Sequence, residues 1–158
     1  MPAADLPTEA LALAWAAQIG AVTWEEVIVW ADGWIEGLDT PPGELLELSL
    51  SGHRLNEAWT LLLTLAQRGH SEGAVSLLAA RWLHSLRVGR VEAAFLAGRL
   101  ERLEQLSFAG VPDNVRLPEP PQEFLDAAHH LWYLLEEWNP EFTPDVTAEV
   151  TDTLQRFL

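Results

Sequence analysis

The sequence predicts an all-α fold: a single irregular bundle of about seven or eight helices, most of them paired as antiparallel hairpins. Successive segments repeat their apolar residues at the helical period of 3.6. Residues that favour helix starts and ends, chiefly Thr, Ser, Gly and Pro, separate these segments. No stretch alternates apolar and polar residues for long enough to predict a strand. The 158 residues are enough for one domain, 1–158, with a substantial core.

Six helices are expected in the first two thirds of the chain. Glycines or prolines separate them, and short links of this kind favour antiparallel neighbours. Thr8 is expected to cap the first helix, and Thr23 with Glu26 matches the capping-box pattern at the start of the second. The expected ranges are about 8–19, 23–38, 41–50, 53–68, 71–88 and 90–108.

The segment 111–121 differs from its surroundings because four of its eleven residues are proline. Proline lacks a backbone donor and breaks regular structure, so we expect an extended crossover or surface loop. Two further helices should follow it. One covers about 121–138, and the last begins at Thr143, Pro144 and Asp145, a strong start signal, and runs to the C-terminus.

The chain is strongly acidic. It has 24 Asp and Glu residues, nine Arg and no Lys, which gives a net charge of −15 and a pI near 4.5. Such a field repels nucleic acids and anionic membranes and attracts basic partners. Because cysteine is absent, disulfides and thiolate metal sites are excluded. No apolar run is long enough to span a membrane and no secretory signal is evident, so we expect a soluble cytoplasmic protein.

Charge is unevenly distributed along the chain. Residues 81–102 carry five Arg against two Glu, whereas the segments on either side are acidic. Pairing of these Arg side chains with carboxylates of neighbouring helices is the ordinary explanation for this basic segment. A contact surface is the alternative.

The helix expected over 23–38 holds the candidate site. A helical wheel predicts an inward face of Trp24, Val27, Ile28, Ala31, Trp34, Ile35 and Leu38. On the opposite side it gathers three carboxylates around an apolar residue, with a tryptophan at the edge of the apolar face. We predict a partner-binding surface composed of Glu25, Val29, Trp30, Asp32 and Glu36, and we predict no catalytic or metal-binding residues and no cofactor.

Two other readings remain open. The polar face of the helix at 121–138 combines carboxylates, histidines and a tyrosine, which is a possible metal-dependent site: Asp126, His129, His130, Tyr133 and Glu137. However, adjacent histidines point in different directions on a helix, and the carboxylate-x-x-His spacing occurs only once, whereas helical di-iron proteins use it twice. The other reading is a structural or regulatory subunit that self-associates through Val29 and Trp30.

The sequences TWEEVIVWAD and LDTPPGELLELSLS, within residues 23–51, resemble segments of small helical bacterial proteins of uncharacterised families. Some of those proteins are similar to immunity proteins that accompany polymorphic toxins. The resemblance implies a non-enzymatic protein that binds and blocks one toxin. Together with the charge, it favours an acidic helical binding protein, of the immunity or inhibitor type, with a basic protein as partner.

Overall fold

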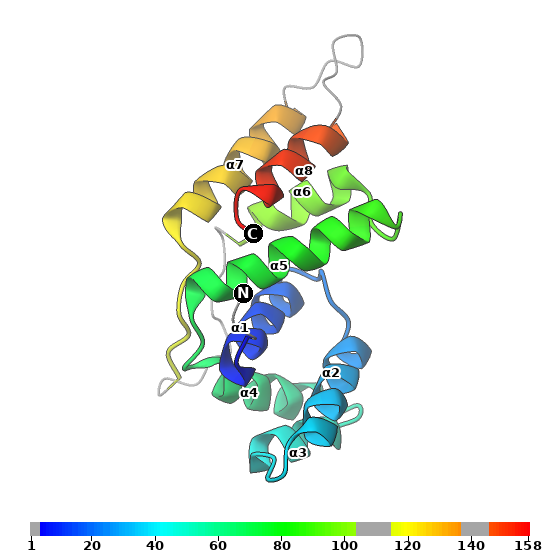
Figure 1. Cartoon of the computed structure of the whole chain (residues 1–158), viewed down its shortest axis with the longest axis vertical. Helices are drawn as coiled ribbons and strands as arrows, with labels where there is room; N and C mark the ends of the chain where they lie inside the picture. The colour runs from blue at the N-terminus through cyan, green and yellow to red at the C-terminus, as the bar shows by residue number, and fades with distance from the viewer. Residues whose placement is uncertain (1–3, 104–114, 137–145) are drawn as a thin grey trace. The chain divides into compact units, whose positions relative to one another are not determined.

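The computed structural model describes residues 4–103, 115–136 and 146–158. Within these ranges the chain forms eight helices and no strand (Figure 1), which confirms the all-α prediction. The helices are α1 (Leu6–Gln18), α2 (Trp24–Gly37), α3 (Gly43–Ser49), α4 (Leu55–Ala66), α5 (Ser71–Arg87), α6 (Ala93–Glu101), α7 (Gln122–Glu136) and α8 (Val146–Gln155). Of these described helices, none combines the length and apolar composition that crossing a bilayer requires.

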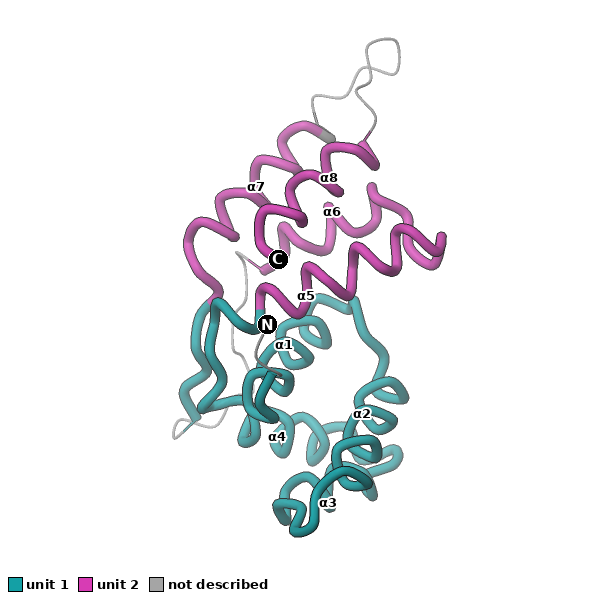
Figure 2. Tube along the Cα trace, viewed as in Figure 1, with its two compact units in different colours: residues 1–74, 108–119 teal, residues 75–107, 120–158 magenta. Residues whose placement is uncertain are grey.

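The chain divides into two compact units (Figure 2). Unit 1 comprises residues 1–74 and 108–119, and therefore holds α1 to α4 and the first turn of α5. Unit 2 comprises residues 75–107 and 120–158, and holds the remainder of α5 with α6, α7 and α8. The single domain expected over 1–158 stays a prediction.

In unit 1, α1 packs against α4 and α2, and α3 packs against α4 and α2. Helix α1 is buried on all its sides, because every residue from Ala10 to Ala16 is buried. A helix that is apolar all round belongs inside a core rather than on its surface. An edge-to-face contact between Trp24 of α2 and Trp59 of α4, with ring centroids 6.1 Å apart, adds a further link within the unit.

The start of α1 differs from the prediction. The prediction that Thr8 is the N-cap was wrong. Asp5 caps the helix, and its Oδ1 accepts a hydrogen bond from the Thr8 backbone N–H at 2.9 Å. Asp caps at least as well as Thr, and Pro7 fits the first turn, where its missing N–H costs nothing. Thr8 is instead buried, and its Oγ1 accepts a hydrogen bond from the backbone N–H of His70 at 3.1 Å.

In unit 2, α6 packs against α7 and α8, and α7 packs against α8. Phe124 of α7 meets Phe157 edge-to-face, with ring centroids 5.0 Å apart. The Ser76 hydroxyl of α5 donates to the backbone carbonyl of Phe157 at 2.7 Å, which fixes the end of the chain within this unit. Gly98 of α6 lies beside the Trp132 ring of α7: a Cβ on this glycine would lie 3.5 Å from the ring, an ordinary van der Waals contact.

The proline-rich segment is described in part. Residues 115–121 contain no helical residue, as expected for a crossover, and 111–114 lie outside the described residues. The helix expected over about 90–108 is shorter, since α6 ends at Glu101. The expected helix start at Thr143 lies outside the described residues, and α8 is described from Val146.

Candidate functional site

Helix α2 begins with the capping box that the sequence predicted. The Thr23 backbone N–H donates to Glu26 Oε2 at 2.7 Å, and the Glu26 backbone N–H donates to Thr23 Oγ1 at 3.3 Å. Two otherwise unpaired donors at the helix start are thereby satisfied. The box fixes where α2 begins, and hence which of its residues face the core of unit 1.

The buried side of α2 is centred on Val27 and Ala31, which are fully buried. The tryptophan at position 34 was expected on this inward face, but it is only half-buried. Four other residues of the expected inward face are half-buried in the same way: Trp24, Ile28, Ile35 and Leu38. A helical wheel identifies the centre of a buried face, whereas the burial of its edges depends on the neighbouring elements.

The outward side of α2 agrees with the wheel. Glu25, Asp32 and Glu36 are exposed, and Val29 lies among them with 69% of its surface accessible. We call these four residues the acidic face. Like charges on one helical face repel by a few tenths of a kcal/mol per pair, and a valine exposed to this extent has no packing role within the chain.

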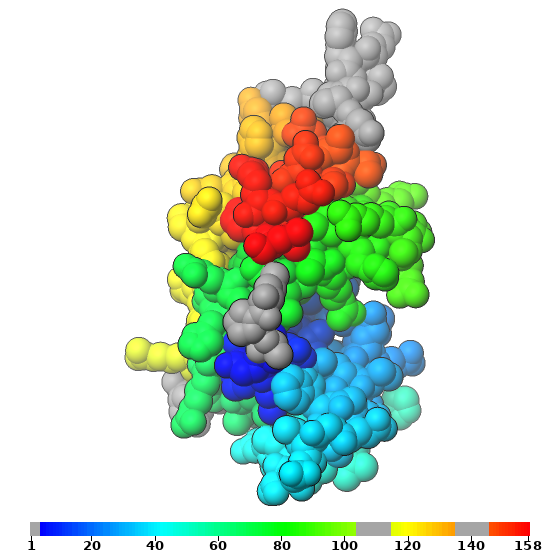
Figure 3. Space-filling model, viewed as in Figure 1, coloured from blue at the N-terminus to red at the C-terminus, as the bar shows by residue number. Residues whose placement is uncertain are grey.

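The acidic face continues onto α3. The Ser49 hydroxyl of α3 donates a hydrogen bond to Asp32 Oδ1, which ties the two helices together on their exposed side. On α3 and at its end, Leu46 is 41% exposed and Leu50 is 78% exposed. In the space-filling view, α2 and α3 form one continuous surface (Figure 3). The surface of α2 and α3 therefore combines carboxylates with three exposed aliphatic side chains.

The structure places Trp30 away from the acidic face. Its indole N–H donates to Glu9 Oε2 of α1 at 2.8 Å, and the indole N–H of Trp34 donates to the same oxygen at 2.7 Å. Trp30 is half-buried at the edge of the apolar face, as the sequence predicted, and its membership of a partner-binding surface stays a prediction. No sequence signal pointed to Glu9, which lies 21 and 25 residues from its two partners.

Between these two rings lies an open hollow of about 370 Å³, lined by Trp30, Gly33, Trp34 and Gly37. The four positions follow the i, i+3, i+4, i+7 spacing of one helix flank. Apart from the adjacent residues and the backbone of α2 itself, a Cβ on either glycine would meet no atom within 4 Å, so no other element fills the space at these positions. We call this feature the tryptophan hollow.

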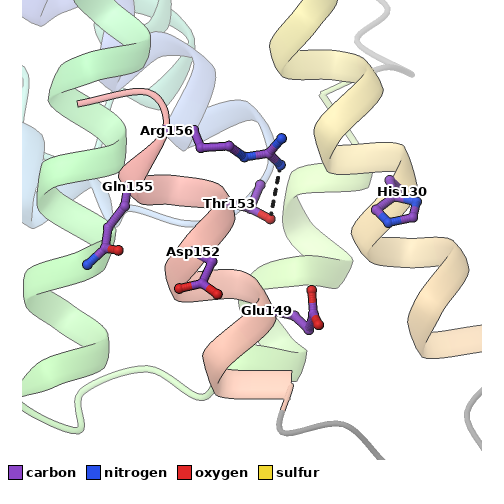
Figure 4. A pocket seen from close by; sticks show the side chains of 6 residues that line it. All are labelled: His130, Glu149, Asp152, Thr153, Gln155 and Arg156. Atoms are coloured by element: carbon purple, nitrogen blue, oxygen red, sulfur yellow. Dashed lines mark hydrogen bonds between the residues drawn. The ribbon is translucent and has the colours of Figure 1, made fainter.

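The polar face of α7 does not assemble a metal site in the described residues. His130 lines an open hollow with four residues of α8 and the residue that follows this helix: Glu149, Asp152, Thr153, Gln155 and Arg156. Figure 4 shows the imidazole and the two carboxylates directed apart rather than toward one point. Asp126 accepts a hydrogen bond from Gln122 at 2.8 Å, and Glu137 lies outside the described residues. No group of three His, Asp or Glu side chains in the described ranges is placed to hold a metal ion.

No family model, curated protein or solved structure matches this chain.

The assignment of function therefore depends on the sites themselves. In the basic segment 81–102, Arg99 lies over the Phe95 ring at 4.8 Å, and Arg87, Arg90 and Arg102 are exposed. The contact between Arg99 and Phe95 lies within α6 and does not test the expected pairing of these arginines with carboxylates of neighbouring helices, which stays a prediction. The acidic face combines like charge with an exposed aliphatic residue, and it is the stronger candidate for a partner surface.

Proposed function

We propose that this chain is a non-enzymatic binding protein, of the inhibitor or immunity type, and that its acidic face receives a basic protein partner. The observation that carries the proposal is the 69% exposure of Val29 among Glu25, Asp32 and Glu36. Charges of one sign around an apolar contact residue give electrostatic complementarity to a partner of opposite charge.

The rest of the chain supports this choice of partner. A net charge of −15 attracts basic proteins over long range and raises the rate at which they meet the acidic face. Helix α2 is held by the buried Val27 and Ala31, so the face is presented on a fixed element. A partner that binds such a preorganised surface loses little conformational entropy on the side of this chain. The resemblance of residues 23–51 to proteins similar to toxin-immunity proteins favours a toxin as the partner.

The proposal is tested with two triple variants of equal net charge. The first neutralises the acidic face: Glu25→Gln, Asp32→Asn and Glu36→Gln. Asn retains an oxygen that can accept the hydrogen bond from Ser49. The control carries Glu72→Gln, Glu92→Gln and Glu123→Gln, three exposed carboxylates that do not lie on α2.

Each protein is used to capture binding partners from extracts of the source cells, at low and at high salt. We expect one basic protein to bind the wild type and the control, and to be lost from the acidic-face variant and at high salt. If that protein is toxic when expressed alone, co-expression of the wild type or the control should restore growth. Equal capture by the two triple variants would contradict the proposal.

A further inference from the structure

The tryptophan hollow has the shape and composition of a site for a flat cation. Its walls are the two indole rings of Trp30 and Trp34, one turn apart, and the backbone at Gly33 and Gly37. Because a Cβ at either glycine would meet nothing within 4 Å, an incoming group can reach the rings without displacing a side chain. Cations are attracted to the faces of such rings within about 6 Å of the ring centre, and tryptophan is the best aromatic partner.

Three sources of negative potential surround this hollow. The Glu9 carboxylate accepts both indole N–H groups through one oxygen, and this polarises the rings so that their faces become more electron-rich. The hollow lies on the last two turns of α2, where the helix dipole is negative. Glu36 is exposed on the same turns, and the last turn of α2 has no basic residue to offset the dipole.

We propose that the tryptophan hollow receives the guanidinium group of an arginine that belongs to the basic partner. Arginine is favoured over lysine because its guanidinium is planar, less strongly hydrated and stacks on aromatic faces, whereas an ammonium group is a compact and strongly hydrated charge. The hollow and the acidic face lie on different flanks of α2, so one basic partner would contact the helix from two sides. That the arginine belongs to a basic partner rests on the proposed function. That the hollow binds a guanidinium group does not depend on it.

The direct test follows the indole N–H signals of Trp30 and Trp34 by ¹H–¹⁵N NMR while a capped tetra-arginine peptide is added. We expect saturable shifts of these two signals and much smaller shifts for the buried Trp15 and Trp82. A capped tetra-lysine peptide should bind several-fold more weakly, and a tetra-glutamate peptide should cause no shift. Equal binding of the lysine and arginine peptides would overturn the assignment to arginine.

Gly33→Leu is the decisive variant, because leucine would occupy the hollow. The change is compatible with folding, since Gly33 has no positive φ and its missing Cβ faces open space. Gly43→Leu is the matched control: that glycine, at the start of α3, also faces open space. The peptide-induced shifts should vanish in Gly33→Leu and persist in Gly43→Leu.

Shifts that survive in Gly33→Leu would overturn the proposal. This failure is distinguishable from failure of the proposed function, because the peptide titration needs no natural partner and leaves the acidic face unchanged. Conversely, the double variant Glu25→Gln with Asp32→Asn keeps Glu36 and the hollow intact, and should bind the peptide with at most the loss expected from its lower net charge. The charge-matched double variant Glu72→Gln with Glu92→Gln should share that loss.

Discussion

At the residue scale, Glu9 joins two helices through a single oxygen atom. Its Oε2 accepts hydrogen bonds from Trp30 at 2.8 Å and from Trp34 at 2.7 Å. The carboxylate also lies in the first turn of α1, where the helix dipole favours negative charge. Glu9 thus holds α2 against α1 and orients both rings of the tryptophan hollow.

We predict that Glu9→Ala lowers the free energy of unfolding by about 1–2 kcal/mol, because two half-buried donors lose a charged acceptor. Glu72→Ala is the matched control, since Glu72 is exposed and also lies in the first turn of its helix, α5. The control variant should lower the free energy of unfolding by no more than the helix-dipole contribution, about 0.3–1 kcal/mol. Equal losses for both variants in urea titrations would show that the indole hydrogen bonds contribute nothing.

Asp5 gives the structure a defined response to acid. Hydrogen bonds from the Thr8 side chain and backbone hold the pKa of Asp5 below its usual range, and the charge of His70 adds to this. A group whose pKa is lowered on folding stabilises the fold above its unfolded pKa, about 3.9 for Asp. That stabilisation is lost as the pH falls through the lower, folded pKa.

We therefore predict that Asp5→Ala lowers the free energy of unfolding by about 1 kcal/mol at neutral pH, the ordinary value of an N-cap. The difference from the wild type should begin to shrink as the pH falls below about 3.9, the unfolded pKa, and should shrink further as the pH falls through the lower, folded pKa of Asp5. Chemical denaturation at a series of pH values measures it. A difference that stays constant or grows in acid would contradict this account of the cap.

Features that depend on neighbouring residues could be predicted from the sequence, whereas contacts between distant residues could not. The Thr23–Glu26 capping box needs only four consecutive residues, and the structure confirms it. Asp5 and Thr8 both suit a helix start, and the choice between them depended on how Thr8 packs against residue 70. The bonds from Glu9 to two tryptophans depend on how α1 packs against α2, which nothing in the local pattern encodes.

At the element scale, the helical wheel placed the centres of both sides of α2 correctly, and the residues at the edges of its inward face are half-buried. Val27 and Ala31 are buried and Glu25, Val29, Asp32 and Glu36 are exposed, as the period requires. Trp34 is half-buried, because its indole N–H bonds Glu9 of α1 while its ring also lines the hollow beside Gly33 and Gly37. Periodicity identifies the centre of a buried face, whereas its edges depend on neighbouring elements.

The link between α4 and α5 approaches α1 closely at Gly69. A Cβ there would lie 2.6 Å from the Pro7 carbonyl oxygen and 2.8 Å from the Leu11 Cβ, and neither atom can move without shifting backbone. We predict that Gly69→Ala lowers the free energy of unfolding by about 1–3 kcal/mol. Gly33→Ala should instead raise it by about 0.5–1 kcal/mol, since that glycine lies in a helix and faces open space.

Urea titrations of the two alanine variants compare them directly. The pair is informative because the chemical change is identical and only the surroundings differ. A stabilising Gly69→Ala would mean that the link does not approach α1 as described. A destabilising Gly33→Ala would mean that the hollow is not open.

At the scale of the whole molecule, the fold class was predictable because it depends on summed local signals. Apolar periodicity, caps and glycine or proline breaks all agreed on helices, and the described residues contain no strand. The division into two units was not anticipated, because it reflects contacts between segments far apart in sequence. The burial of α1 on all sides could likewise not be predicted from the sequence, since an Ala-rich helix also suits a surface position.

The net charge of −15 should weaken the folded state through self-repulsion. We predict that the melting temperature rises with sodium chloride between about 0.01 M and 0.15 M, as the Debye length falls from ~30 Å to ~8 Å. A stabilisation of about 1 kcal/mol corresponds to about 2–4 °C for a chain of this length. Helical circular dichroism followed on heating measures it, and a melting temperature that falls with salt would contradict the expectation.

The central claim is that the acidic face, rather than total charge, directs binding of a basic partner. The most direct measurement is the association rate of the captured partner, as a function of ionic strength, with the acidic-face triple variant and with the charge-matched control. Both variants carry the same net charge, so they differ only in which carboxylates are lost. We predict that the acidic-face variant associates about tenfold more slowly at low salt, with a flatter salt dependence, while the control stays close to the wild type. If the acidic-face variant associates at the wild-type rate at low salt, the claim is wrong and the face is merely solvated.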